Sequence, residues 1–290
     1  MLEGILVIGL VRGGIYALLA VGFSLIFGVA RLINLAHTCF YMLAAYGLYT
    51  FASQAGLHPI VSIILSLLIT TLIGISTYKL FIDRVREHHV TVLLITLALA
   101  MIFQECMLLA FGSHYLGAPS FISGYWEIVG VKVSYQHLLT FGTVLVVLLG
   151  VWALLSKTRL GIAIRATAQD PEIAGLMGIN VPRILLTTMG IAAALAAVAG
   201  IVVAPTLILE PHMWTHPLVM IMAIVVLGGL GSIKGSFIGA FIIGFVEVSV
   251  VFIWPEYGFL KGATALLAMV TILLVRPEGL FGVAFEEERL

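Results

Sequence analysis

The chain has 290 residues, of which 62% are hydrophobic and only 10% are Asp, Glu, Lys or Arg. Soluble domains carry roughly 25% charged residues because their surfaces face water. A chain with so few charges must be solvated by lipid over most of its surface, which predicts a polytopic membrane protein. The 14 basic and 14 acidic residues balance, so the net charge does not favour nucleic acid or another polyanion as a partner.

Nine apolar segments are candidates for membrane-spanning helices, since a helix needs about 20 apolar residues to cross a core of roughly 30 Å. They are Gly13–Ala30, Leu32–Ala52, Ile60–Phe81, Val90–Phe111, His137–Leu155, Ile184–Leu209, Leu218–Ile233, Ser236–Ile253 and Phe259–Val275. The second and seventh are the weakest candidates. Because the segments are continuous and do not alternate, a β-barrel is excluded. The predicted fold is all-α, a polytopic helical membrane protein of about eight or nine transmembrane helices.

No linker or change in composition divides the chain, so residues 1–290 are expected to form a single transmembrane domain. The N-terminus lacks the basic region of a cleaved signal peptide, so the first apolar segment is expected to remain. The last acidic run, Glu286–Glu288, is expected to be a solvated tail.

The distribution of lysine and arginine predicts the orientation. If nine segments cross and the C-terminus is cytoplasmic, the cytoplasmic side holds Arg31, Lys79, Arg84, Arg86, Lys157, Arg159, Arg165, Arg183, Lys234, Arg276 and Arg289. The outer side then keeps only Arg12, Lys132 and Lys261. Cytoplasmic loops carry an excess of Lys and Arg, so the N-terminus is predicted to lie outside.

The cytoplasmic loop 156–183 contains the signals of a short, well-delimited helix. Asp170 is a typical N-cap residue, and Pro171 suits the first helical position. Glu172 complements the positive end of the helix dipole. Gly178 supplies a left-handed stop, and Pro182 is expected to prevent the helix from resuming.

The predicted face of this helix, Ile173, Ala174 and Met177, is small and apolar. A membrane protein has no core on this side against which to bury it, which favours a docking element for a cytoplasmic partner. The alternative is an ordinary loop helix that lies on the membrane surface.

Asn34 and His37 stand near the start of the second apolar segment, where polar side chains are costly unless they face a cavity or another helix. One interpretation is a broken helix whose polar groups line a translocation pathway. The other is that both residues hydrogen-bond between helices, or that the segment lies at the inner interface beside Arg31.

Gly231, Gly235 and Gly239 are spaced to share one helical face, which would let two helix backbones approach closely. If the chain turns at Lys234, they would form a tight re-entrant bend. The stretch is not a phosphate-binding loop, because no Gly-Lys-Ser or Gly-Lys-Thr occurs in the chain.

Glu105 and Glu247 lie within apolar segments, each near the outer end, and intramembrane carboxylates are candidates for function. A pair that shared a proton or a cation would favour a secondary transporter. Alternatively, both side chains reach the outer interface and are structural. We find no motif for a catalytic residue. Cys39 and Cys106 both fall in apolar segments and predict neither a disulfide nor a metal site.

Five stretches resemble the first permease of branched-chain amino-acid ABC importers, and the resemblance extends over nearly the whole chain. They are Gly13–Gly28 (GGIYALLAVGFSLIFG), Ile33–His37 (INLAH), Phe40–Tyr46 (FYMLAAY), Arg165–Ile179 (RATAQDPEIAGLMGI) and Leu227–Ala240 (LGGLGSIKGSFIGA). Thr38 departs from this pattern, because the family usually has glycine there.

The resemblance implies a permease subunit that pairs with a second homologous permease, two cytoplasmic ABC ATPases and an extracytoplasmic substrate-binding protein. It implies that ATP and Mg are bound by the ATPases, with no cofactor on this chain, in a bacterial or archaeal plasma membrane. The coupling residues would be Arg165, Asp170, Pro171, Glu172, Ile173, Ala174, Gly175, Met177 and Gly178. The candidate pathway residues are Asn34, His37, Thr38 and Tyr41.

Similar permeases serve urea and short-chain amides, so the substrate stays open among these and the branched-chain or other hydrophobic amino acids. The rival from another class is a proton-coupled secondary transporter that uses Glu105 and Glu247.

Overall fold

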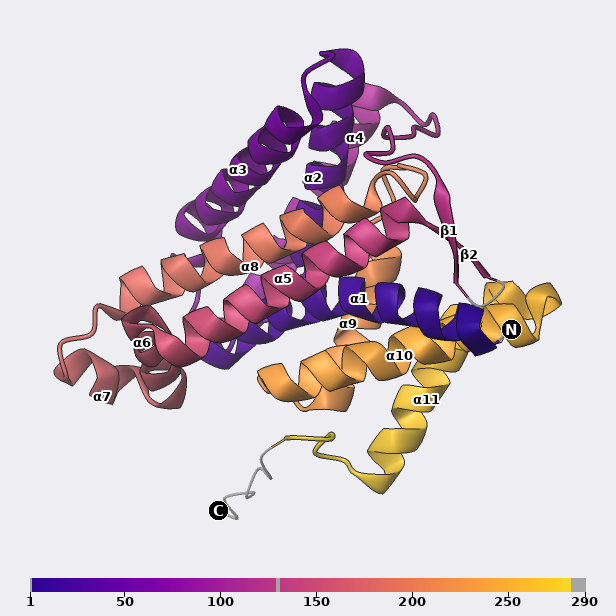
Figure 1. Ribbon diagram of the computed structural model, residues 1–290. Coiled ribbons are helices and arrows are strands. Elements are labelled where there is room, and N and C mark those ends of the chain that lie inside the picture. Colours follow the sequence, from indigo (N-terminus) through magenta and orange to yellow (C-terminus); the bar gives the residue numbers. More distant parts are fainter. Residues whose placement is uncertain (1, 129–130, 283–290) are drawn as a thin grey trace.

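The computed structural model describes residues 2–128 and 131–282, so the predicted tail Glu286–Glu288 lies outside the described residues (Figure 1). The helices are α1 (Leu2–Ala30), α2 (His37–Tyr49), α3 (Pro59–Thr77), α4 (His89–Phe111), α5 (Tyr135–Lys157), α6 (Arg159–Gln169), α7 (Pro171–Leu176), α8 (Val181–Val203), α9 (Thr215–Gly228), α10 (Ile233–Ile253) and α11 (Lys261–Val275). One π-helical turn, Thr50–Gln54, continues α2, and another, Tyr78–Ile82, continues α3. A 3₁₀ segment, Pro255–Leu260, precedes α11.

Seven helices of the described chain are long and apolar enough to cross a membrane. They start at Leu2, Pro59, His89, Tyr135, Val181, Ile233 and Pro255, the last including the 3₁₀ segment. Two shorter helices, α2 and α9, are not among these seven. They coincide with the second and seventh predicted segments, which were the weakest of the nine. The prediction of a polytopic helical membrane protein is confirmed.

Several predicted boundaries were wrong. Helix α1 begins at Leu2 rather than Gly13, so Arg12 lies inside a helix and not in an outer loop. The second helix starts at His37 rather than Leu32, because the chain turns between the two. Helix α9 ends at Gly228, where Gly229 adopts a φ of +95°, and does not continue to Ile233.

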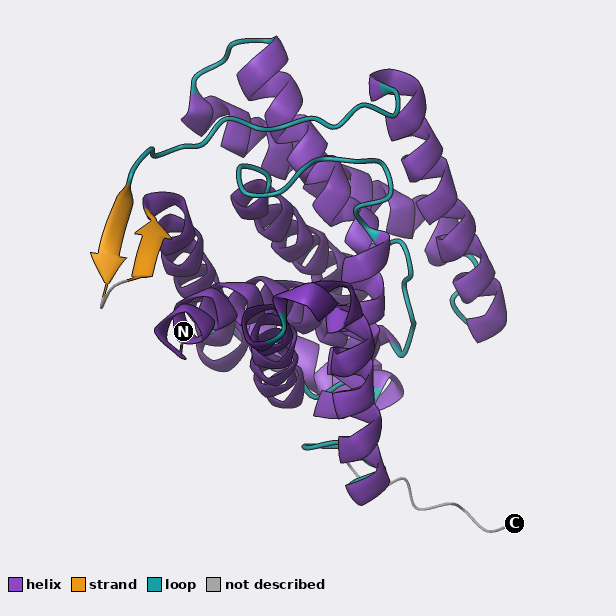
Figure 2. Cartoon of the chain, turned by 90° about the vertical axis from the view of Figure 1, so that its right-hand side faces the viewer, coloured by secondary structure: helices purple, strands orange, loops and turns teal. Residues whose placement is uncertain are grey.

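The long loop after α4 forms a small β-hairpin, which the sequence analysis missed. Strands β1 (Tyr125–Ile128) and β2 (Val131–Ser134) pair antiparallel, with Tyr125 opposite Ser134. The hairpin lies beside the N-terminal end of α1 (Figure 2). Helices α6 and α7 lie at the opposite end of the molecule (Figure 1).

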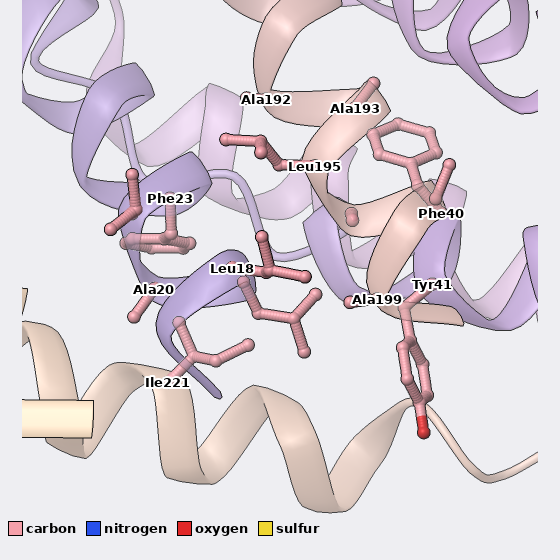
Figure 3. Close-up of a cluster of buried hydrophobic side chains, with 14 of the residues drawn as sticks. Leu18, Ala20, Phe23, Phe40, Tyr41, Ala192, Ala193, Leu195, Ala199 and Ile221 are labelled. Carbon is pink, nitrogen blue, oxygen red and sulfur yellow. The ribbon is translucent and has the colours of Figure 1, made fainter. Parts of the chain in front are cut away.

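Helices α1 and α8 form the centre of the bundle. In each, 72% of the most apolar 18-residue window is buried, against 28% in α3, 22% in α4 and 17% in α5. Figure 3 shows Leu18 and Phe23 of α1 near Leu195 of α8, with Phe40 of α2 next to Ala193. The outer helices therefore expose their apolar side chains to lipid, as expected where lipid replaces water as the solvent.

Close packing of α1 against α10 depends on glycine. A Cβ atom added at Gly4 or Gly13 would lie 2.7 Å from the ring of Phe252 or Phe241, and one at Gly9 would collide with Phe245. The three aromatic rings thus occupy notches that glycine leaves open, and the helix backbones can approach closely without a hydrophobic driving force.

The predicted orientation can be tested by labelling single cysteines at Gln169 and Ser123, both of which are exposed. The background must lack Cys39 and Cys106, because Cys106 is exposed. We expect Gln169→Cys in intact cells to react only with a membrane-permeant reagent, and Ser123→Cys to react with an impermeant one. The reverse pattern would overturn the orientation.

Candidate functional site

Helix α7 has the boundaries that its sequence signals predict. The Asp170 side chain accepts hydrogen bonds from the backbone N–H groups of Glu172 and Ile173, both at 2.9 Å, and Pro171 stands at the start of the helix. Gly178 follows with a φ of +85°, in the left-handed region. An Asp N-cap of this kind contributes about 1 kcal/mol, so a six-residue helix can hold its shape.

The exposed face of α7 differs in one residue from the prediction. Ile173 and Met177 are 59% and 79% exposed, as expected for a docking face, but Ala174 is only 4% exposed and points into the chain. Leu176, which was not predicted, is 87% exposed. The apolar surface that α7 presents is therefore Ile173, Leu176 and Met177, which we call the α7 face.

Helix α6 contacts the end of α5 on one side and α7 on the other. Thr158 caps α6, accepting a hydrogen bond from the backbone N–H of Gly161 at 3.1 Å. The Arg165 guanidinium donates to the backbone carbonyl of Leu155 at the end of α5. Arg165 therefore helps to position α6. Its side chain is also exposed, and its role in coupling stays a prediction.

Pro182 has a different role from the one predicted. It stands in the first turn of α8, where the Asn180 side chain accepts a hydrogen bond from the backbone N–H of Arg183 at 3.1 Å. Proline is well tolerated at this position, because the N–H groups of a first turn have no partner in the helix. Pro182 thus begins the next helix and does not end α7.

The predicted pathway residues lie in the interior of the chain. Asn34, His37, Thr38 and Tyr41 are all buried. The His37 ring nitrogen Nε2 lies 3.1 Å from the carbonyl oxygen of Leu19 in α1, and Asn34 Nδ2 lies 3.9 Å from Met189 Sδ in α8. These contacts match the alternative of hydrogen bonding between helices, and the pathway role stays a prediction.

Threonine at position 38, where the family usually has glycine, causes no strain in the backbone. Thr38 is the second residue of α2, and Arg31 is the only non-glycine residue of the described chain with a positive φ. A Cβ atom is therefore compatible with this position. The Oγ1 atom of Thr38 has no hydrogen-bond partner in the described chain.

The glycine-rich stretch forms a tight bend at residues 229–232, before Lys234 rather than at it, and not one continuous helical face. Gly231 precedes α10 and has a φ of +81°, so it does not share a helical face with Gly235 and Gly239 as predicted. The latter two do allow close packing, because a Cβ atom at Gly235 would collide with the backbone of Gly228, and one at Gly239 would lie 3.0 Å from the Ile224 carbonyl oxygen.

The C-terminal segment closes this bend. The backbone N–H groups of Leu280 and Phe281 donate to the carbonyl oxygens of Leu227 and Gly228, at 2.8 and 3.0 Å. These carbonyls belong to the last turn of α9, which has no intrahelical donors for them. The end of α9 is therefore held by residues that lie beyond α11.

Glu247 is the centre of a buried polar cluster that joins four helices. Its carboxylate accepts a hydrogen bond from the Tyr16 hydroxyl of α1 at 2.5 Å. Its second oxygen lies 3.6 Å from Lys261 Nζ at the start of α11 and 3.8 Å from His216 Nε2 in α9. Lys261 was predicted to lie outside, in a loop, but it serves as the counter-charge of Glu247.

Glu105 has a different environment from Glu247. Its side chain is exposed on α4 and is 3.5 Å from Gln104 Nε2. Gln104 in turn accepts a hydrogen bond from Trp214 Nε1 at 2.9 Å. The carboxylates thus have no contact partner in common in the described chain, and nothing in this arrangement favours a proton shared between them.

Replacing each glutamate by glutamine should affect thermal stability differently at the two positions. Glu105→Gln is expected to change neither uptake nor thermal stability. Glu247→Gln keeps an acceptor for Tyr16 but leaves Lys261 without its counter-charge. The free energy of unfolding should fall by about 1–3 kcal/mol. The loss is limited because Lys261 also reaches solvent or headgroups. We expect substantial uptake and a melting temperature lower by a few degrees in detergent. Lost uptake with unchanged melting would instead indicate a functional carboxylate.

The chain is similar in sequence to a known family of transport proteins. Residues 5–275 match the family model described as branched-chain amino acid transport system / permease component. The chain belongs to this family. It is 29% identical, over 96% of its length and 94% of the relative, to the high-affinity branched-chain amino acid transport system permease protein BraD of Pseudomonas aeruginosa. It is also 29% identical to the permease protein LivH of Salmonella typhimurium, over 94% of this chain and 93% of that one.

A solved structure shows a similar fold. PsaBC from Streptococcus pneumoniae in complex with Fab has a TM-score of 0.52 and 12% identity, covering 93% of this chain and 90% of that chain. The chain is therefore a multi-pass membrane permease, one component of a transport system with several subunits.

Proposed function

We propose that this permease is the transmembrane subunit of an ATP-binding-cassette importer, powered by two separate cytoplasmic ATPase subunits. The observation that carries the proposal is the α7 face. Ile173, Leu176 and Met177 are exposed on a rigid, capped helix at the end of the bundle that is predicted to be cytoplasmic. An apolar surface held in this way on a short helix is typical of a protein contact.

The same proposal includes a second, homologous permease subunit and an extracytoplasmic substrate-binding protein. ATP and Mg would be bound by the ATPases and not by this chain. The membrane would be the plasma membrane of a bacterium or archaeon, and both relatives compared above come from bacteria. Co-purification from native membranes tests these partners, and recovery of the chain without an ATPase would count against them.

The proposed substrate is a branched-chain or other hydrophobic amino acid. The names of BraD and LivH specify branched-chain amino acids, and each aligns over more than nine-tenths of its length. Urea and short-chain amides are the alternative within the same family. Uptake of labelled leucine, urea and acetamide, each measured separately, distinguishes them, and uptake of urea or acetamide without uptake of leucine would reject the amino acids.

The energy source separates the importer from a proton-coupled carrier. We expect uptake in intact cells to persist when an uncoupler collapses the proton gradient while ATP is maintained, and to stop when ATP is depleted. The physical reason is that ATP hydrolysis and not proton flow would drive the change in conformation. Uptake by the purified single chain in liposomes, driven by a pH gradient alone, would refute the proposal.

A further inference from the structure

An apolar groove runs between α3 and α4. Its cavity has a volume of about 450 Å³, with Leu72, Ser76 and Leu80 on one wall and Leu99, Ile102 and Phe103 on the other. None of the described residues that line it is charged. Only 28% of the apolar window of α3 and 22% of that of α4 is buried, so both helices face lipid. The groove is thus open to the hydrocarbon of the bilayer.

The length of the groove suits one acyl chain. On the α3 side its lining extends from Ile69 to Phe81, a rise of roughly 18 Å at 1.5 Å per residue. One leaflet contributes about half of a hydrocarbon core of roughly 30 Å. A chain that enters from the Phe81 end would therefore reach the far end of the groove near the middle of the bilayer.

A second cavity, of about 200 Å³, adjoins the groove at Ile69 and Ile73. Its lining is less suited to an acyl chain than that of the groove. Tyr46 and Ser66 line it, and their buried hydroxyls have no hydrogen-bond partner in the described residues. Hydrocarbon cannot satisfy a buried hydroxyl. The larger cavity is therefore the better place for an acyl chain.

Positive charge gathers at the opposite end of the groove, in the turn that is predicted to be cytoplasmic. Lys79 and Arg84 are exposed there and form no ion pair within the described chain, whereas Arg86 lies 3.5 Å from Asp83. Lys79 directly precedes Leu80 and Phe81, which line that end of the groove. Basic side chains at the cytoplasmic mouth of a groove between helices attract anionic headgroups.

We propose that the groove between α3 and α4 binds one acyl chain of an anionic phospholipid from the cytoplasmic leaflet, with its headgroup at Lys79 and Arg84. The site is independent of the proposed importer function, since it uses neither the α7 face nor the predicted pathway residues. A second permease subunit seated in the groove is the competing occupant, and the experiment below distinguishes the two.

The test measures phosphatidylglycerol and phosphatidylcholine binding to the purified chain, with whatever subunits accompany it, by native mass spectrometry and thermal shift. We expect phosphatidylglycerol to be retained in preference to phosphatidylcholine. Ser76→Trp should fill the groove and abolish that preference, whereas Leu68→Trp, exposed on the same helix outside the cavity, should not. Lys79→Glu should weaken phosphatidylglycerol binding by about tenfold, and the matched control Lys234→Glu should leave it unchanged.

Equal retention of the two lipids, or an unchanged preference in Ser76→Trp, would overturn the proposal. Loss of a second permease subunit from Ser76→Trp, with lipid binding unaltered, would assign the groove to a subunit contact instead. Because Ser76 is exposed, the indole can be accommodated without disturbing the core. The melting temperature without lipid checks that both tryptophan variants fold.

Discussion

Replacing Leu176 by glutamate is expected to reduce ATP-driven uptake by about thirtyfold while the amount of permease in the membrane stays unchanged. Leu176 is 87% exposed, so the folded chain loses no burial when the side chain changes. In a docked complex the same position would be desolvated, and an unpaired carboxylate there costs at least about 2 kcal/mol. The loss should therefore appear in binding of the ATPase and not in folding.

Two other variants sharpen this test. Gln169→Glu introduces the same charge just before α7, outside the α7 face, and should leave uptake near normal. Ala174→Glu should behave differently from Leu176→Glu, because Ala174 is buried and its carboxylate would destabilise α7 itself. Uptake and ATPase co-purification are the measurements. Normal values of both for Leu176→Glu would remove the α7 face from the coupling contact.

Gly178→Val should also impair coupling, through the shape of α7 rather than its surface. Gly178 has a φ of +85°, which costs a β-branched residue on the order of 1–2 kcal/mol. The left-handed stop would be lost, and the direction of the chain from α7 into α8 would change with it. This variant should reach the membrane and bind the ATPase weakly.

The second large effect is expected from Gly235→Val, which should remove most folded permease from the membrane. A Cβ atom at Gly235 would collide with the carbonyl group of Gly228, a backbone atom that cannot rotate away. Because α9 and α10 approach each other here, overpacking should cost about 3 kcal/mol or more. Detergent-resistant protein and its melting temperature measure the loss.

The matched control for this variant is Gly150→Val in α5. Apart from the adjoining backbone of its own helix, no heavy atom of the described residues lies within 4 Å of a Cβ atom built at Gly150. Both substitutions place valine in an apolar helix, so they share the same loss of helix propensity. Equal yields of the two variants would show that the bend between α9 and α10 can open, contrary to the close backbone packing described here.

Local signals were sufficient for much of this protein. Uninterrupted apolar segments determined that the chain is a helical membrane protein, because the bilayer requires about 20 apolar residues per crossing. Asp170, Pro171 and Gly178 determined where α7 begins and ends. Each of these acts on backbone groups within a few residues of itself, so no knowledge of distant contacts is needed.

Other features depend on contacts between segments far apart in the chain. The partners of Glu247 come from α1, α9 and α11, and no local pattern links Tyr16 or Lys261 to it, although a tyrosine hydroxyl within an apolar helix does call for a partner. The direction of Ala174 was decided in the same way, since an isolated helix has no inner side.

The tertiary structure alone also decided which helices are central. The windows of α1, α3 and α8 have similar mean hydropathy, between 2.1 and 2.3, yet 72% of the α1 and α8 windows and only 28% of the α3 window are buried. Lipid and protein interior are equally apolar solvents, so hydropathy cannot tell a lipid-facing helix from a core helix. Which helices are central depends on close packing at glycine positions, such as Gly9, which accommodates the ring of Phe245. These packing sites form only when the helices assemble.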